Sequence, residues 1–556
     1  MTRWWHTLQD WRLAWVLVGC VCLQSALMAL TTPPGYAPDE AAHMAYIRDS
    51  ARSRLLLPDY VGGKLPDGRP NYLGHPPLYY ASLGLLSKAG RWEGPRAQTA
   101  MRLASATFMM LGLAFAVLAA RRIGVGQSYV AMALLACAAT PMFSYQAGSV
   151  SNDTLLYLGV NMMFYGMACR VTLADRPREG LAWLYLGLAI VFLTKATGAT
   201  FVVFTVLATA LMGLRRPRDW LQRWIDWRWL GALALVVGGY YVSSLLLYGT
   251  PFPKPGELYP DTPVANLLAF PDYAREFAQS MWRRLPVVMS HLSVAPIPQW
   301  LTPVFHGMVF LPLVGWLVVR FSPALSTGAT DVIRMLDAVA LGALCTLTLH
   351  LTLGYQGYLR NGVLGGFQPR YYAYLIPLAW CAFFAICRPG WFRSSVAALF
   401  CASAIVVFWG SVPFTQLRQQ EALLARPQSF AYQAQPGAQS LDVSLRLRGP
   451  ATGSVDEFSL ANGWLHARGW VFDLERRQRV PRLWIHLGPQ YVTSVKVQAL
   501  RPDVATALNL PQADLSGFAL RFGGLPATVQ RCDVVLLAEY ADGSFGRLAI
   551  PGCPVD

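Results

Sequence analysis

Charged side chains are scarce in this chain of 556 residues. Only 14% of the residues are Asp, Glu, Lys or Arg, whereas a typical soluble domain carries about 25%. Hydrophobic residues make up 54%, and apolar runs of roughly 17–22 residues recur, each long enough to cross a hydrocarbon core of about 30 Å. The composition excludes a large soluble protein. It indicates a polytopic membrane protein that is mainly α-helical.

Repeats of fixed period and low-complexity runs are also absent, which excludes a solenoid or a propeller. Cysteines are few outside the apolar runs, because eight of the ten lie in or beside them, where we expect packing residues. The other two, Cys532 and Cys553, lie in a polar C-terminal segment. If that segment is extracytoplasmic, we expect them to form a disulfide that closes its last strands.

Acidic residues are scarcer than basic ones, 30 against 46, which gives a formal net charge of +16. From residue 451 onward there are ten of each, so the positive excess belongs to the apolar part of the chain. It includes the first polar loop, where basic side chains at headgroup level would attract anionic lipid phosphates. Nucleic acid is a poor partner, because we expect these charges to face outward.

The apolar pattern predicts eleven membrane spans. They lie near 13–30, 100–119, 128–146, 154–172, 180–195, 198–214, 229–247, 303–320, 335–353, 372–387 and 396–413. Clustered arginines in alternate gaps place the N-terminus inside and the C-terminal region outside. A single span over 180–214 would bury Lys195 in the membrane. Insertion of a lysine at the centre of a span costs roughly 2.5–3.5 kcal/mol. We therefore predict a helical hairpin that turns at 194–198 and leaves Lys195 on the outer side.

These spans divide the chain into three parts. Residues 1–413 form a membrane domain whose first outer loop, 31–98, is too long for a simple connection and is expected to be functional. Residues 414–450 are predicted to be a polar tether. Residues 451–556 carry short alternating strands and predict a β-sandwich-like domain.

An acidic and histidine cluster directly follows the first span: Asp39, Glu40 and His43. A carboxylate here is placed to act as a general base toward an incoming hydroxyl. Asp39 is the leading candidate, and Glu40 is the alternative base or a metal ligand. On a helix, His43 returns to the same face as both carboxylates. The competing interpretation, an N-cap at a helix start, has equal weight.

Three further motifs enter spans from the outer side. His75 precedes a Pro-Pro-Leu run with Tyr79 and Tyr80, which predicts an interfacial helix; membrane anchoring outweighs catalysis as its role. Asp153 begins the fourth span, as an N-cap or as a second acid in the same cavity. Arg370 begins the tenth span, and its planar fork suits phosphate oxygens, although snorkelling arginines are common at span ends. Independent caps and anchors would scatter over both membrane faces, but these groups share one face with Asp39 and Lys195.

In these motifs the chain resembles the GT-C class of multispanning glycosyltransferases. The pattern is most similar to the group of lipid A aminoarabinose transferase and protein O-mannosyltransferase, and to related bacterial proteins of unassigned substrate. The resemblance covers about 13–413 and rests on their order: Tyr36-Ala-Pro-Asp39-Glu40-Ala-Ala-His43, His75-Pro-Pro-Leu-Tyr-Tyr80, Val150-Ser-Asn-Asp153, Leu193-Thr-Lys195 and Gln368-Pro-Arg370-Tyr371.

The resemblance implies an inverting transfer of sugar from a polyprenyl-phosphate donor to a glycan, lipid or protein acceptor. By resemblance Asp39 is the base and Glu40 the close second. Many relatives have a lysine at the position of His75, where it meets the lipid phosphate; here Lys195 and Arg370 are expected to supply that charge. The remaining expected substrate contacts are His43, Tyr79, Tyr80, Asp153 and Tyr371.

Some relatives use a divalent metal such as Mg²⁺ or Mn²⁺, which Asp39, Glu40 and His43 would hold if it is present. The expected location is the bacterial inner membrane, with the N-terminus cytoplasmic and the C-terminal domain outside. The alternative function is a non-enzymatic carrier (flippase) of lipid-linked sugars, or an assembly protein for envelope polysaccharide.

Overall fold

The computed structural model describes most of the chain. The described residues are 12–32, 37, 39–65, 70–92, 94–172, 179–213, 218, 222, 224–254, 256, 267–289, 294–296, 298–327, 330–361, 368–425, 447–461, 464–487, 492–497, 499, 501–523, 529–542 and 544–553.

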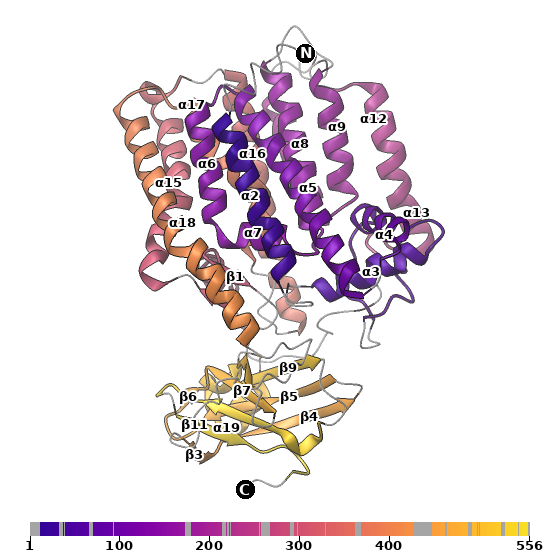
Figure 1. Cartoon of the computed structure of the whole chain (residues 1–556), viewed down its shortest axis with the longest axis vertical. Coiled ribbons are helices and arrows are strands. Elements are labelled where there is room, and N and C mark those ends of the chain that lie inside the picture. The colour runs from indigo at the N-terminus through magenta and orange to yellow at the C-terminus, as the bar shows by residue number, and fades with distance from the viewer. Residues whose placement is uncertain are drawn as a thin grey trace.

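Long apolar helices form a bundle, and a smaller β domain lies beyond one end of it (Figure 1). Within the described ranges, seven helices are long and apolar enough to cross a membrane, or eight if the bent pair α6–α7 is one span. The bundle helices are α2 (Arg12–Thr31), α5 (Gly94–Arg122), α6 (Gln127–Ala139), α7 (Pro141–Ala147), α8 (Asp153–Thr172), α9 (Glu179–Phe192), α10 (Ala196–Gly213), α12 (Trp227–Leu233), α13 (Gly239–Tyr248), α15 (Thr302–Phe321), α16 (Thr330–Asn361), α17 (Ile376–Ile386) and α18 (Trp391–Ala425). A π-helical turn, Ala234–Gly238, joins α12 to α13.

Each of the eleven predicted spans coincides with helix, but fewer segments satisfy the length and hydropathy test. The short ones have local causes. Helix α9 ends where the chain turns toward Lys195, and α17 starts late because Pro369–Leu375 forms a 3-10 turn first. Helix α18 continues to Ala425, past the expected start of the tether at 414.

Helix α8 is the centre of the bundle, and only Tyr165 among residues 153–170 is partly exposed. Glycines let its backbone approach α9 closely. A Cβ on Gly166 would lie 2.4 Å from the backbone nitrogen of Leu184, and one on Gly187 would lie 2.6 Å from the carbonyl oxygen of Gly159. Any larger residue at these positions would force the two helices apart.

The segment 180–214 is interrupted, as the burial cost of Lys195 predicts. Helix α9 ends at Phe192 and α10 begins at Ala196, so Lys195 lies in the break. The amide of Asn152 donates to the carbonyl of Thr194 (3.2 Å), which fixes this break beside the start of α8. Lys195 therefore lies at the same end of the bundle as the segment after α2.

Several short elements gather at that end, which faces the β domain (Figure 1). They are α3 (Glu40–Arg52), α4 (Leu78–Gly90), the amphipathic helix α14 (Phe270–Arg284), and the hairpin β1 (Val287–Met289) with β2 (Val294–Pro296). Helix α3 packs against α4, and both belong to the first loop, which the sequence predicts to be functional. This loop is therefore folded structure rather than a linker.

The β domain consists of two sheets that share one apolar core, as a sandwich-like domain predicts. One sheet has the order β3-β11-β10-β7-β8, and the other contains β4, β5 and β6, with β9 also paired to β5. The strands are β3 (Leu447–Pro450), β4 (Gly453–Ala461), β5 (Trp464–Asp473), β6 (Gln478–Arg479), β7 (Arg482–Leu487), β8 (Val492–Lys496), β9 (Gly517–Gly523), β10 (Val534–Glu539) and β11 (Phe545–Leu548).

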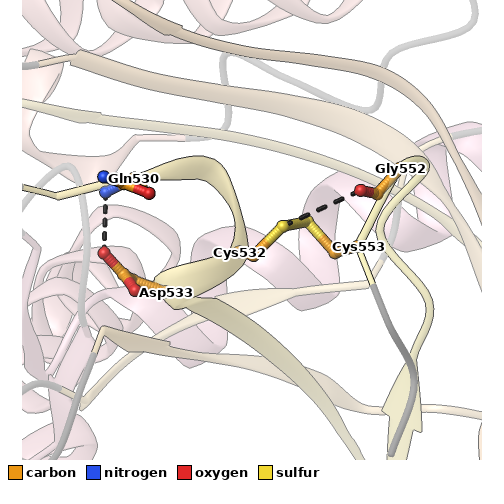
Figure 2. The surroundings of a disulfide bond; sticks show 5 residues. All are labelled: Gln530, Cys532, Asp533, Gly552 and Cys553. Carbon is orange, nitrogen blue, oxygen red and sulfur yellow. Dashed lines mark hydrogen bonds between the residues drawn. A yellow bond between two sulfur atoms is a disulfide. The ribbon is translucent and has the colours of Figure 1, made fainter.

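A disulfide joins Cys532, just before β10, to Cys553, just after β11 (Figure 2). The two Cα atoms are 5.3 Å apart. In the same turn, the backbone N–H of Gln530 donates to Asp533 at 2.7 Å. The bridge therefore ties the last described residues to the start of β10, within the five-stranded sheet.

Candidate active site

Asp39 precedes helix α3 with a left-handed backbone (φ 59°). Aspartate is one of the few residues that adopt this conformation readily. Its side chain makes no capping hydrogen bond to α3. Instead, Asp39 accepts a hydrogen bond from the hydroxyl of Tyr72 (2.7 Å) and pairs with Nη2 of Arg370 (2.9 Å). The carboxylate is thus aimed away from its own helix and toward two distant segments.

A second ion pair lies at the start of α8. Nζ of Lys195 donates to Oδ1 of Asp153 at 2.5 Å, and the two side chains are only 8% and 5% exposed. The hydroxyl of Ser151 also lies 3.3 Å from the carboxylate of Asp153. Because both charges are removed from water, each depends on the other for its stability.

Tyr371 connects the two ion pairs. Its ring lies 4.6 Å from Nζ of Lys195 and 5.5 Å from the guanidinium carbon of Arg370. Both cations are thus within cation–π range of one aromatic ring. The structure therefore brings Asp39, Asp153, Lys195 and Arg370 into one cluster, from four segments far apart in the sequence.

His43 and His75 lie against this cluster with their rings stacked 6.2 Å apart. Burial lowers the pKa of His43 to about 4 and that of His75 to about 3, outweighing the opposing effect of the nearby carboxylates. His43 is buried, at 4% exposure, whereas His75 is half-buried. Both rings are neutral at pH 7, which leaves His75 without the charge that a lysine would bring to its position.

Tyr79 and Tyr80 are fully buried within the protein, so their rings pack against other residues rather than lie on the helix surface. The hydroxyl of Tyr80 lies 3.0 Å from Nδ1 of His43, and that of Tyr79 lies 2.7 Å from the hydroxyl of Ser105. Burial raises the pKa of both tyrosines. Their closest role in the structure is to pack behind His43, and direct substrate contact stays a prediction.

Glu40 is satisfied by structural partners and is poorly placed to act as the base. Nε and Nη2 of Arg102 donate to its two oxygens at 2.7 and 2.8 Å. The amide of Gln98 (2.8 Å) and the backbone N–H of Val150 (3.2 Å) complete the set. With its side chain completely covered, Glu40 ties α3 to α5, which leaves Asp39 as the better-placed candidate for a base.

The proposed metal ligands do not converge. Asp39 points to Arg370, Glu40 to Arg102 and His43 to Tyr80. Within the described part of the chain, no three His, Cys, Asp or Glu side chains are arranged to hold a metal ion. The set of Asp39, Glu40 and His43 predicted from helical spacing therefore does not form a metal site in this conformation.

Two residues that contact the acidic cluster, Tyr72 and Arg102, were not predicted from the sequence. Arg102 had a signal: it lies inside the predicted span 100–119, where an arginine needs a carboxylate partner. Tyr72 had none, because a tyrosine in a long loop gives no indication of which group it will meet.

Among the four charged members of the cluster, Asp39 has the most accessible side chain, 21% exposed against 5–8% for the other three. Solvent therefore contacts this carboxylate more than it contacts the other three side chains. The arrangement provides one accessible base backed by two cations on one aromatic ring, which suits proton removal beside a developing negative charge.

A family model described as "Predicted membrane protein (DUF2142)" matches residues 66–382. Among solved structures, the chain is similar to ArnT from Cupriavidus metallidurans bound to undecaprenyl phosphate, with 16% identity and a TM-score of 0.36. The apo state of the same protein matches with 16% identity and a TM-score of 0.35, and each match covers 70% of this chain and 77% of the other. ArnT is a member of the GT-C class that the sequence motifs resemble. No curated protein matches. The family model spans more than half of the chain, and the chain therefore belongs to the DUF2142 family of membrane proteins.

Proposed function

We propose that this protein is a GT-C glycosyltransferase of the bacterial inner membrane. It would move a sugar from a polyprenyl-phosphate donor to an acceptor in the cell envelope, on the outer face of the membrane. The N-terminus would be cytoplasmic and the β domain extracytoplasmic. The observation that carries the proposal is the cluster of Asp39, Arg370, Asp153 and Lys195 at one end of the bundle.

In the proposed reaction, Asp39 accepts the proton of an acceptor hydroxyl as its oxygen attacks the anomeric carbon. A new carbon–oxygen bond forms while the bond from that carbon to the phosphate oxygen breaks. The bonding electrons leave with the lipid phosphate. A single displacement of this kind inverts the anomeric centre.

Lys195 and Arg370 would stabilise the departing phosphate. Both are paired with carboxylates in this conformation, so a phosphate must compete with Asp153 and Asp39 for them. Arginine offers two parallel donors to such an anion, whereas lysine acts as a point charge. Contact of Arg370 with the phosphate would also free Asp39 to meet the acceptor.

The test uses purified full-length protein in lipid nanodiscs and a panel of radiolabelled polyprenyl-phosphate sugars. We expect wild type to release sugar from one donor and Asp39→Asn to lose this activity while still binding the donor. Asparagine also tolerates the left-handed backbone, so the variant should fold. Asp272→Asn is the matched control, because Asp272 lies on the exposed face of α14 and its side chain pairs only with Arg275 among the interactions described.

The outcome also separates the rival functions. A carrier of lipid-linked sugars would bind donor and move it across the bilayer without releasing sugar in either protein. An assembly protein would show no dependence on Asp39 at all. Sugar release that is equal in wild type and Asp39→Asn would refute the role of Asp39 as base.

A further inference from the structure

Arg370 belongs to two sites. Its Nη2 pairs with Asp39, and its side chain also lines a small cavity between α7, the C-terminal end of α14 and the 3-10 turn before α17. The rest of the polar lining includes Gln146 from α7, Gln368 from the start of that turn, and a second arginine, Arg284, at the end of α14. Met142 and Phe143 form part of the apolar wall. Asp39 does not line this cavity. The cavity is therefore a separate site from the ion pair between Asp39 and Arg370.

Three polar atoms of the cavity lining are buried without a hydrogen-bond partner among the described residues. They are Oε1 of Gln146, Oε1 of Gln368 and Nε of Arg370. Gln146 is 4% exposed and Arg370 is 7% exposed. A buried polar atom that stays unsatisfied costs about 1–3 kcal/mol, and native proteins rarely leave several together. A group bound in the cavity that these three residues line would supply the missing partners.

The chemistry of these atoms selects a hydroxyl. Nε of Arg370 can only donate, whereas the two amide oxygens can only accept. A hydroxyl does both, and it also satisfies either orientation of the amide groups. A phosphate dianion has no proton to give to an amide oxygen. The three unsatisfied atoms therefore suit a hydroxyl, which both donates and accepts, better than a fully ionised phosphate.

We propose that this cavity is a subsite for a glycan acceptor, and that one hydroxyl of a sugar is anchored by Gln146, Gln368 and Arg370. This inference rests on the proposed function and deepens it. Arg370 lines the cavity and pairs with Asp39 through Nη2. A hydroxyl bound to Nε would therefore be separated from the base only by the guanidinium group of Arg370. The adjacent hydroxyl of the same sugar is then presented to Asp39.

The proposed subsite favours one class of acceptor. A serine or threonine side chain offers one hydroxyl, and that hydroxyl is consumed as the nucleophile. A sugar ring offers neighbouring hydroxyls, one to anchor and one to react. The geometry therefore favours a glycan over a protein side chain.

The experiment measures binding without any need for turnover. Saturation-transfer NMR follows methyl β-D-glucopyranoside with the full-length protein in nanodiscs. We expect transfer from wild type, and at least a fivefold weaker signal with Gln146→Leu. Gln279→Leu makes the same substitution at an exposed position of α14 and should keep the wild-type signal.

Equal transfer from all three proteins, or none from wild type, would overturn the subsite and leave a bound water as the occupant. If Gln146→Leu does not fold, as judged by its thermal unfolding, Gln368→Leu gives the same readout. The proposed transferase function fails separately, when wild type releases no sugar from any donor. Glucoside binding that depends on Gln146 can still be observed in that case.

Discussion

The pair of Lys195 and Asp153 allows stability and activity to be separated. Replacement of Lys195 by methionine leaves Asp153 buried at 5% exposure without its cation. Removing one partner of a buried pair costs about 3–5 kcal/mol, whereas replacing both with neutral residues is often harmless. We expect Lys195→Met to be destabilised by that amount, and the double variant Lys195→Met/Asp153→Asn to recover most of it.

The assay is the unfolding midpoint of each protein in the same nanodiscs, together with sugar release. The double variant should regain the wild-type unfolding free energy within about 1 kcal/mol. It should remain inactive, because the departing phosphate has lost a cation. The exposed pair of Arg275 and Asp272 (69% and 51% exposed) provides the reference, with an expected effect of about 0–1 kcal/mol. A double variant as unstable as Lys195→Met would refute the coupling between the buried charges.

Three further outcomes follow from the site and the β domain. Because the pKa of His43 is lowered to about 4, the unfolded chain takes up a proton below pH 6.5 that the native state does not bind. The unfolding free energy should therefore fall by about 1.6 kcal/mol between pH 6.5 and 5, and by less in His43→Gln. Tyr72→Phe removes the 2.7 Å hydrogen bond to Asp39 and should slow sugar release at least tenfold with donor affinity unchanged, since a bond to a charged group contributes about 1.5–3 kcal/mol. Cys532→Ser should destabilise the β domain by about 2–5 kcal/mol, seen as a lower unfolding midpoint for that domain, while sugar release by the membrane domain stays at the wild-type level.

Composition and local pattern predicted the architecture well. Apolar runs located helices at all eleven predicted spans, and alternating strands identified the β domain. The break between α9 and α10 at Lys195 was predicted from the free-energy cost of placing a lysine in hydrocarbon. These features depend on the bilayer and on short-range periodicity, which a single sequence contains.

Side-chain partners were less predictable, because they depend on the tertiary fold. The helical spacing of Asp39, Glu40 and His43 suggested one shared site, yet each of the three faces a different partner. Glu40 and Asp39 are neighbours in sequence, and only the positions of Arg102 and Arg370 decide which of them is structural. No local sequence pattern predicts which arginine, dozens or hundreds of residues away, will pair with a given carboxylate in the fold.

The burial of α8 has a consequence for how this protein is made. In the finished molecule this helix touches little lipid, but the chain enters the membrane from its N-terminus, so α8 must be inserted before α9 and α10 exist. Its carboxylate at Asp153 precedes Lys195 by 42 residues. During synthesis the carboxylate of Asp153 therefore reaches the membrane surface before Lys195 can pair with it. Helix α5, which is already inserted, is the partner available to shelter α8 during that interval, and a ribosome that stalls between the two residues would leave a segment that quality-control proteases can recognise.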